Sequence, residues 1–340
     1  MAVLPEEVQS KHVDEVMRVV DLVVRSELEE LSVVELGLDQ WKNELRRLDA
    51  LHYQQSYGYL NSSRRFTEIR LIGVYRGGEI VGAVAVGIKK WYCFSLKVLN
   101  MGPSFTVQEP LESKRAIVAI SKKITTHLKS RRALVVGRLA WRPSEDDLKL
   151  MGFREIWKTT RYMTGRIDLR TEEGVIMKNL RSSWRRQLKK SIKLCSVSVQ
   201  RGMTDCEIGG VMTRYREHQV RRGYNGIDKS QLMRLREGFD TQLYYLRGYS
   251  KECGGLIGEV VLLAFADTIT YLIGIQNEEG RTRQVNTRLF WEAIVHGKHT
   301  GYKYMDLGGL DIEGNGDIAR FKLGLSPELC ESSRIVIGVF

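Results

Sequence analysis

A lysine in an apolar setting follows a glycine-rich loop near the end of the sequence. Residues 302–307 form a short apolar run that breaks at Gly308 and Gly309, which is typical of a strand that opens into a loop. Lys322 follows between Phe321 and a leucine. A buried lysine is costly unless it faces a developing negative charge, and acyl transfer creates such a charge. Two interpretations are open: Lys322 stabilises an oxyanion, or it is a structural lysine at a strand edge that extends its charge to water.

A cluster of positive charge lies in the middle of the chain. Residues 178–193 include seven basic residues and no acidic one. The spacing predicts one helix over residues 177–193, with Trp184, Leu188 and Ile192 on its apolar face and cations on the opposite face. Like charges at this spacing repel slightly, which favours a phosphate-binding surface over a merely solvated one. The predicted nucleic-acid contacts are Arg185, Arg186, Lys189, Lys190 and Lys193.

Length and composition bound the class of protein. The chain has 340 residues, a net charge of +12 and 43% hydrophobic residues, so two soluble domains are expected, together with polyanionic partners. There is no apolar run of membrane-spanning length and no secretory h-region, which predicts a cytoplasmic protein. The five cysteines are dispersed without CxxC spacing, so neither disulfides nor a metal site are expected. The histidines lack a nucleophile-elbow partner, and covalent catalysis is not predicted.

One α/β arrangement recurs along the chain. Residues 6–50 are predicted to be helical, and residues 67–88 to form a β-hairpin around a glycine turn. A second hairpin is predicted over residues 243–265, followed by a strand at 268–275. Each hairpin precedes an amphipathic helix, at 114–130 and 284–299, which suggests an internal duplication. The predicted domains are residues 1–167 and 168–327, with a tail at 328–340 that returns to pack on the first domain.

Several segments resemble one family in the same order. The run Asp306-Leu307-Gly308-Gly309-Leu310, followed by Phe321-Lys322 and a glycine, is similar to the closing signature of the FemAB-type (FemX-like) aminoacyltransferases. The basic segment at 178–190 and the helix at 286–294 resemble further parts of that family. The match is good over residues 150–326 and thin before them. The resemblance implies an α/β (α+β) fold of two tandem GNAT domains and a transferase that forms peptide bonds in cell-wall biogenesis.

The resemblance also implies roles for individual residues. Lys322, with Phe321 and Asp306 in support, would be catalytic, although Asp306 is equally suited to capping a strand end. Arg221 matches the family's phosphate-binding arginine. The family's second phosphate ligand is a lysine, but the matching position here lies near Ser63, with Arg64 and Arg65 adjacent. The identity of the acceptor substrate is therefore left open. Gly308, Gly309 and Tyr304 are further predicted substrate contacts.

Three functions are compatible with these observations. The first is transfer of an aminoacyl group from aminoacyl-tRNA to an amine of a UDP-linked or lipid-linked peptidoglycan precursor, by a monomer without a cofactor that touches the membrane surface at most peripherally. The second is an acyl-CoA-dependent N-acyltransferase, or a Fem-like ligase, acting on a polysaccharide or small metabolite. It is less favoured because Gln276–Arg283 is a poor match to a glycine-rich pyrophosphate loop. The third is a catalytically silent binding module, against which Phe321 and Lys322 argue.

Overall fold

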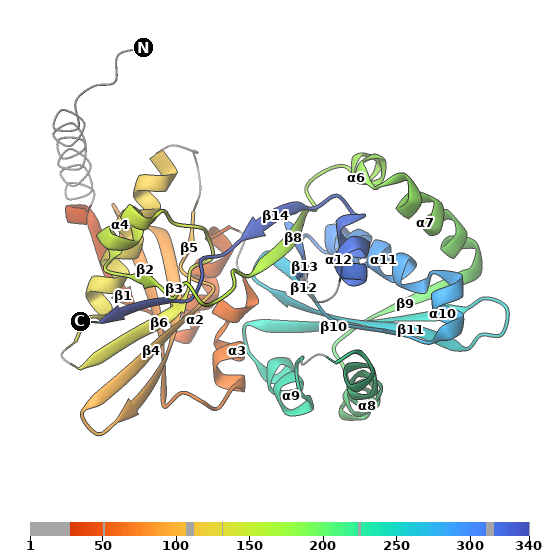
Figure 1. Ribbon diagram of the computed structural model, residues 1–340, viewed down its shortest axis with the longest axis horizontal. Helices are drawn as coiled ribbons and strands as arrows, with labels where there is room; N and C mark the ends of the chain where they lie inside the picture. The colour runs from red at the N-terminus through yellow and green to blue at the C-terminus, as the bar shows by residue number, and fades with distance from the viewer. Residues whose placement is uncertain are drawn as a thin grey trace, which may run out of the picture.

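The computed structural model describes residues 28–49, 52–106, 112–130, 132–223, 226–310 and 316–339. Two mixed β-sheets with flanking helices form two halves that lie side by side (Figure 1). Within the described residues, no helix combines the length and the hydropathy needed to cross a bilayer. The α/β class predicted from the sequence is confirmed.

The first half is built on an eight-stranded sheet. Its strands are β1 (Leu31–Glu35), β2 (Glu68–Arg76), β3 (Glu79–Trp91), β4 (Phe94–Asn100), β5 (Ser104–Phe105), β6 (Ala133–Arg138), β7 (Arg154–Glu155) and β15 (Val336–Val339). They follow the order β1-β2-β3-β4-β6-β15-β7, and β5 pairs with β3. The helical elements of this half are α2 (Leu38–Glu44), η1 (Leu45–Arg47), η2 (Tyr53–Gln55), α3 (Tyr57–Ser62), α4 (Glu112–Leu128) and α5 (Glu145–Met151).

The second half contains a seven-stranded sheet. Its strands are β8 (Met163–Asp168), β9 (Cys195–Arg201), β10 (Thr241–Ser250), β11 (Leu256–Phe265), β12 (Thr268–Gln276), β13 (Tyr304–Gly309) and β14 (Glu328–Glu331). Their order is β14-β8-β13-β12-β11-β10-β9. The helices are α6 (Glu173–Asn179), α7 (Ser182–Leu194), α8 (Asp205–Arg222), α9 (Lys229–Glu237), α10 (Glu278–Arg283), α11 (Val285–His299) and α12 (Gly316–Leu323).

The two halves repeat one order of elements. An antiparallel hairpin, β2–β3 or β10–β11, is followed by a further antiparallel strand, β4 or β12. A helix, α4 or α11, then leads to a strand that pairs in parallel with that third strand. Both predicted hairpins and both predicted amphipathic helices are therefore present.

The helical prediction for residues 6–50 is right only in part: α2 and η1 lie within it, but a strand precedes them. Residues 1–27 lie outside the described residues, and residues 31–35 form β1, an edge strand paired antiparallel with β2. Leu31 is buried whereas Val34 is 44% exposed, so the side chains alternate as in a strand. The adjacent β-branched residues Val33 and Val34 favour the strand.

The chain crosses the junction between the halves twice, from β7 to β8 and from β14 to β15. The predicted boundary at residue 167 falls inside β8, which pairs with β13 and β14 in the second sheet. Within the predicted tail, β14 stays with the second sheet, and β15 pairs with β6 and β7 in the first. In Figure 1 this last segment is the blue strand that runs from the right half to the left half.

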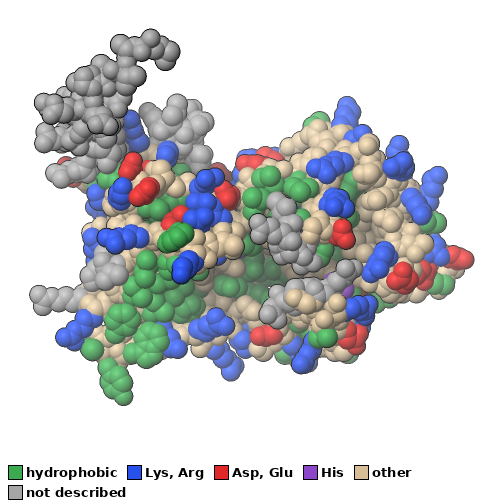
Figure 2. Space-filling view, in the orientation of Figure 1, with side chains coloured by type: hydrophobic (Ala, Val, Ile, Leu, Met, Phe, Trp, Pro, Cys, Tyr) green, Lys and Arg blue, Asp and Glu red, His purple; other side chains and the backbone are tan. Residues whose placement is uncertain are grey.

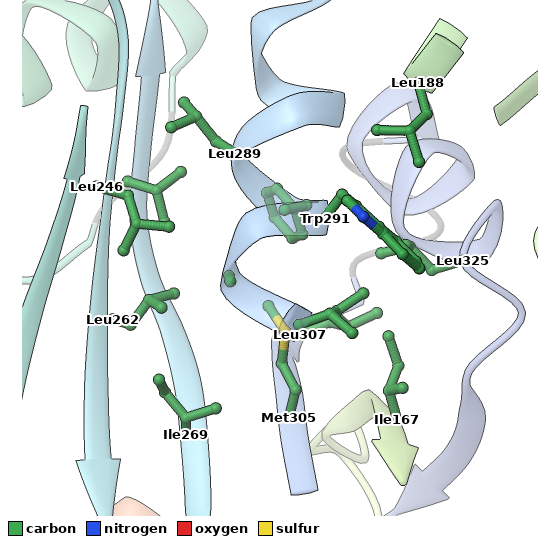
Figure 3. Packing of buried hydrophobic residues seen from close by; sticks show 14 of the residues in the cluster. Ile167, Leu188, Leu246, Leu262, Ile269, Leu289, Trp291, Met305, Leu307 and Leu325 are labelled. Atoms are coloured by element: carbon green, nitrogen blue, oxygen red, sulfur yellow. The ribbon is translucent and has the colours of Figure 1, made fainter. Parts of the chain in front are cut away.

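The core of the second half holds the strand that leads to the predicted active site. Met305 and Leu307 of β13 are fully buried. Figure 3 shows them between Leu262 and Ile269 on one side and Ile167 on the other. Burying such side chains contributes roughly 2 kcal/mol each. The loop that follows β13 therefore leaves from a fixed position.

Candidate active site

A gap opens in the second sheet between β12 and β13. The two strands pair in parallel only from Thr268 to Thr270 and from Tyr304 to Asp306, and no pairs follow. The register of β13 against β8 also shifts between Asp306 and Gly309. The end of β13 therefore diverges from β12.

The loop after β13 is folded by Asp306. Its Oδ1 atom accepts hydrogen bonds from the Gly308 amide (2.6 Å) and the Thr164 hydroxyl (2.5 Å), and the side chain is buried. Gly308 has φ +69°, and a Cβ there would lie 2.9 Å from the Tyr271 carbonyl oxygen, so glycine is required. Asp306 thus shapes the turn, as the capping interpretation predicts, and its charge acts on neighbouring groups.

Lys322 reaches this loop from a helix. The structure places it in the last turn of α12, not at the strand edge that the structural interpretation assumed. Its side chain is 5% exposed, and Nζ donates to the Gly309 carbonyl (2.9 Å) and lies 5.0 Å from the centre of the Tyr271 ring. Burial lowers the pKa of Lys322 to about 8, and the charge of Asp306 partly opposes this shift. Among the described residues Lys322 forms no ion pair, so its charge is available to a substrate.

Aromatic side chains hold α12 in place. Phe321 lies between the rings of Trp184 and Phe290, with centroid distances of 5.7 and 5.2 Å. Gly324 allows this packing because a Cβ there would lie 2.5 Å from Trp184. Phe321 therefore positions the lysine that follows it.

A pocket of about 510 Å³ opens beside Lys322. Lys322 and Phe321 line it from α12, and Tyr271 lines it from β12. Asn286, at the start of α11, also lines it, and its Oδ1 is buried without a partner among the described residues. His218 of α8 completes one side. Sequence reasoning gave neither Tyr271 nor Asn286 a role, because Tyr271 stands in an apolar strand segment and Asn286 was only the first residue of the family-like helix at 286–294.

The remaining predicted substrate residues lie in different places. Gly309 is beside Tyr162, since a Cβ on Gly309 would meet that ring at 3.2 Å. Tyr304 faces away from the pocket: its ring stacks on the guanidinium groups of Arg166 and Arg170, and Arg170 donates to its hydroxyl. Its direct substrate role has no support in this arrangement.

The three predicted phosphate-binding arginines lie on or next to helices that pack against α9. Arg64 and Arg65 are exposed just after α3, which packs against α9. Arg221 is exposed near the end of α8, one turn beyond His218, and α8 also packs against α9. The two groups thus lie on helices that share one neighbour.

The predicted basic helix is two helices. The chain is extended at Leu180 and Arg181, which separates α6 from α7. Arg185 donates to the carbonyl oxygens of Lys178 (2.6 Å) and Leu180, so it closes α6 and does not face solvent as a free cation. Ile192, assigned to the apolar face, is 40% exposed.

The other predicted nucleic-acid contacts remain accessible. Arg186, Lys189 and Lys193 are exposed on α7 and form no ion pair with another described residue. Lys190 is also exposed and donates weakly to the Thr282 carbonyl (3.3 Å). Four of the five predicted contacts can therefore meet a polyanion.

The segment after β12 differs from a pyrophosphate-binding loop. It forms the short helix α10, whose N-terminus is capped by Asn277 and carries Glu278 and Glu279. Gly280 is buried, and a Cβ there would lie 2.1 Å from the Ile257 carbonyl oxygen. This glycine thus serves packing, and the acidic first turn repels an anion.

A buried aromatic cluster joins the two halves, and sequence reasoning missed it. His52 stacks on Tyr53 (4.9 Å) and contacts the edge of Tyr162 (5.8 Å), and Tyr53 packs against Tyr59. Nδ1 of His52 accepts from the Gln54 amide, and Nε2 is buried without a partner among the described residues. Burial lowers the pKa of His52, while Asp306 opposes the shift. No local signal links these residues, because the fold alone brings them together.

Comparison with known proteins agrees with this geometry. Residues 178–323 match the family model described as an acetyltransferase (GNAT) domain. This segment is a GNAT domain. It includes α7, the β12–β13 gap and Lys322, and it makes the chain a protein of the acyltransferase type.

Solved structures extend the likeness to both halves. The structure of FemX is 14% identical, with 91% of this chain and 97% of that chain covered and a TM-score of 0.72. A conserved protein of unknown function from Bacteroides thetaiotaomicron VPI-5482 is 10% identical, with 91% and 100% covered and a TM-score of 0.56. The FemX-like tandem GNAT fold predicted from the sequence is confirmed. None of the curated proteins compared with the chain matches it in sequence.

Proposed function

We propose that the protein transfers an aminoacyl group from aminoacyl-tRNA to an amine of a peptidoglycan precursor. The observation that carries the proposal is the buried Lys322 amine beside the pocket that β12, α11 and α12 line. An ammonium group has three N–H donors, and Lys322 uses one on Gly309. Among the described residues no other acceptor is bonded to this amine, so its other two donors can bind an oxygen in the pocket.

The proposed reaction is direct attack of a neutral amine on the ester carbonyl. A nitrogen–carbon bond forms, and the carbonyl oxygen becomes a tetrahedral oxyanion that the Lys322 charge stabilises. The intermediate collapses with loss of the ribose hydroxyl, whose oxygen takes up a proton as the amine nitrogen gives one up. Holding both substrates in one site supplies most of the remaining advantage.

Two groups of exposed cations support the assignment of the two substrates. Arg221, Arg64 and Arg65 are assigned to the diphosphate of a nucleotide-linked or lipid-linked acceptor, because arginine offers paired donors to phosphate oxygens. Arg186, Lys189 and Lys193 on α7 are assigned to the phosphates of tRNA. The acyl-CoA alternative is disfavoured by the capped, acidic start of α10.

One experiment separates the candidate functions. The purified protein is incubated with a UDP-linked muramyl peptide and either a mixture of radiolabelled aminoacyl-tRNAs or labelled acetyl-CoA. We expect label in the peptide only with tRNA. Transfer from acetyl-CoA alone would replace the proposal with the CoA-dependent function, and no transfer from either donor would favour the silent module.

Two variants make the result specific to the site. Lys322→Met removes the charge and keeps a long apolar side chain, so it should abolish most of the transfer. Lys158→Met changes an exposed lysine of the first half and should leave the transfer unchanged. Equal activity of both variants would show that the transfer does not depend on the pocket beside Lys322.

A further inference from the structure

The β3–β4 hairpin ends in an exposed group of aromatic side chains. Trp91 is 43% exposed, Tyr92 is fully exposed and Phe94 is 40% exposed. Trp91 and Phe94 face each other across the hairpin, with ring centroids 6.3 Å apart. Figure 2 shows hydrophobic side chains gathered at the lower left, where this hairpin ends in Figure 1. We call residues 91–94 the aromatic tip.

The turn at this tip holds Tyr92 in an unfavourable backbone conformation. Tyr92 has φ +39°, a conformation that bulky residues rarely adopt. The hairpin turn between β2 and β3 instead places Gly77 and Gly78 at positive φ. An aromatic residue kept in a strained turn position, where glycine would fit better, indicates that the ring itself has a use.

Positive charge surrounds the aromatic tip. Nζ of Lys89 lies 5.0 Å from the centre of the Trp91 ring. The loop between α4 and β6 runs beside the tip, because the Ser95 amide donates to the Arg132 carbonyl, and this loop exposes Lys129 and Arg132. The acidic residue at the adjoining end of β2, Glu68, is paired with Arg70 and Lys90. The surface around the rings is therefore cationic.

A buried hydrogen bond joins the β3–β4 hairpin to the end of α4, next to the basic loop. Lys97 of β4 is buried, and its Nζ donates to the carbonyl oxygen of Leu128 at the end of α4. The hairpin and the basic loop are thus tied together behind the tip. The rings and the cations are presented as one surface.

We propose that the aromatic tip enters the headgroup region of an anionic lipid bilayer. Tryptophan and tyrosine favour the membrane interface, where their rings are apolar and their polar ends stay hydrated. Lysine and arginine beside them attract anionic headgroups and extend their charges to the surface. A protein partner or a second copy of the chain could bind the aromatic side chains, but neither explains the neighbouring cations. The inference does not rest on the proposed acyl transfer.

Vesicle binding by the full chain tests the proposal. Wild-type protein is mixed with phosphatidylcholine vesicles containing a minority of phosphatidylglycerol, and bound protein is separated by flotation. We expect binding to these vesicles and little to phosphatidylcholine alone. Tyr92→Gly relieves the turn and removes one ring, and the triple change Trp91→Ser, Tyr92→Gly and Phe94→Ser removes all three. Partitioning should weaken several-fold in the single variant and roughly tenfold or more in the triple variant.

Controls show whether the aromatic tip itself is responsible for vesicle binding. Trp157→Ser removes another exposed tryptophan of the first half and should leave binding unchanged. Wild-type protein that ignores anionic vesicles, or a folded triple variant that binds them equally well, overturns the proposal. A concentration-dependent dimer that the triple variant loses, without vesicle binding, would instead assign the tip to a second copy. Acyl transfer to a soluble UDP-linked peptide should be the same in the triple variant, so failure here is distinct from failure of the proposed function.

Discussion

The Lys322 amine is buried, which disfavours its charged form, but the groups around it stabilise the charge. The Gly309 carbonyl and the Tyr271 ring face the amine, and Asp306 contributes charge without forming an ion pair with it. Each of these contacts is weaker than a direct carboxylate pair. The amine is therefore stabilised enough to stay charged near neutral pH, and a developing oxyanion would be its strongest partner.

Replacing Lys322 with Met should separate catalysis from folding. Turnover in the tRNA-dependent assay should fall roughly a hundredfold or more, because the oxyanion loses its counter-charge. Thermal stability near pH 7 should be retained, because the variant removes a desolvated charge and keeps the apolar stem. Single-turnover kinetics and a thermal melt measure the two effects. Near wild-type turnover would make Lys322 a structural residue.

Stability should depend on pH through the same lysine. Its pKa is about 8 in the folded protein and near the ordinary 10.5 when unfolded, so the unfolded chain binds the proton more tightly. The destabilising contribution is fully present below pH 8 and is relieved as the pH rises from 8 towards 10.5, by roughly 3 kcal/mol. Urea unfolding of wild type and Lys322→Met across this range should show the gain only in the wild type. The charge needed for catalysis is lost over the same range, so turnover should fall above pH 8. Parallel stability curves for the two proteins would argue against the lowered pKa.

At the scale of elements, the sequence was informative where local pattern decides structure. Alternating apolar residues and glycine turns identified both hairpins, and the spacing of apolar residues identified α4 and α11. The break at Leu180 and Arg181 carries no glycine or proline, so periodicity alone joined α6 and α7. The role of Arg185 follows from that break. The carbonyl groups that it binds lack a partner within the helix only because α6 ends there. Contacts such as His52 with Tyr162 depend on how the halves pack, and no local pattern reports them.

The helix α7 should bind tRNA through its exposed cations. Changing Arg186, Lys189 and Lys193 to Glu should weaken tRNA binding by at least tenfold, because phosphates lose their counter-charges. The slope of log affinity against log salt should also fall by about one for each phosphate that the variant no longer neutralises. Filter binding at several salt concentrations measures both quantities.

A charge-matched control makes the test specific. Changing Lys42, Arg115 and Lys158 to Glu alters net charge equally but affects exposed residues of the first half. Its binding should weaken much less. If the two triple variants lose affinity equally, α7 provides only general positive charge and is not the tRNA contact.

At the scale of the molecule, the halves are held together by buried polar contacts as well as by the crossing strands. Asp240, just before β10, accepts hydrogen bonds from the amides of Tyr57 (2.7 Å) and Gly58 (3.0 Å) at the start of α3. Burial raises the pKa of Asp240. This carboxylate from the second half thus satisfies the N-terminus of a helix in the first, which fixes the junction on which Arg64 and Arg65 lie.

The last strand should stabilise the opposite end of the chain. Val336 is fully buried in the core of the first half, so Val336→Asp should destabilise that half by about 3 kcal/mol or more. Amide hydrogen exchange should then lose protection in β6, which pairs with β15. Leu329→Asp, on an exposed position of β14, is the matched control and should leave β6 protected. Loss of protection confined to the second sheet in Val336→Asp would contradict the predicted dependence.

The return of β15 also sets the order in which the protein can be completed during synthesis. The first sheet lacks the strand between β6 and β7 until residues 336–339 have been made. About 180 residues separate β7 from β15, which at roughly 5–20 residues per second corresponds to about 10 to 40 s of translation. During that time the facing edges of β6 and β7 are open to pairing with other chains. The nascent first half therefore has a period of exposure to chaperones and to aggregation that ends only when β15 has left the ribosome.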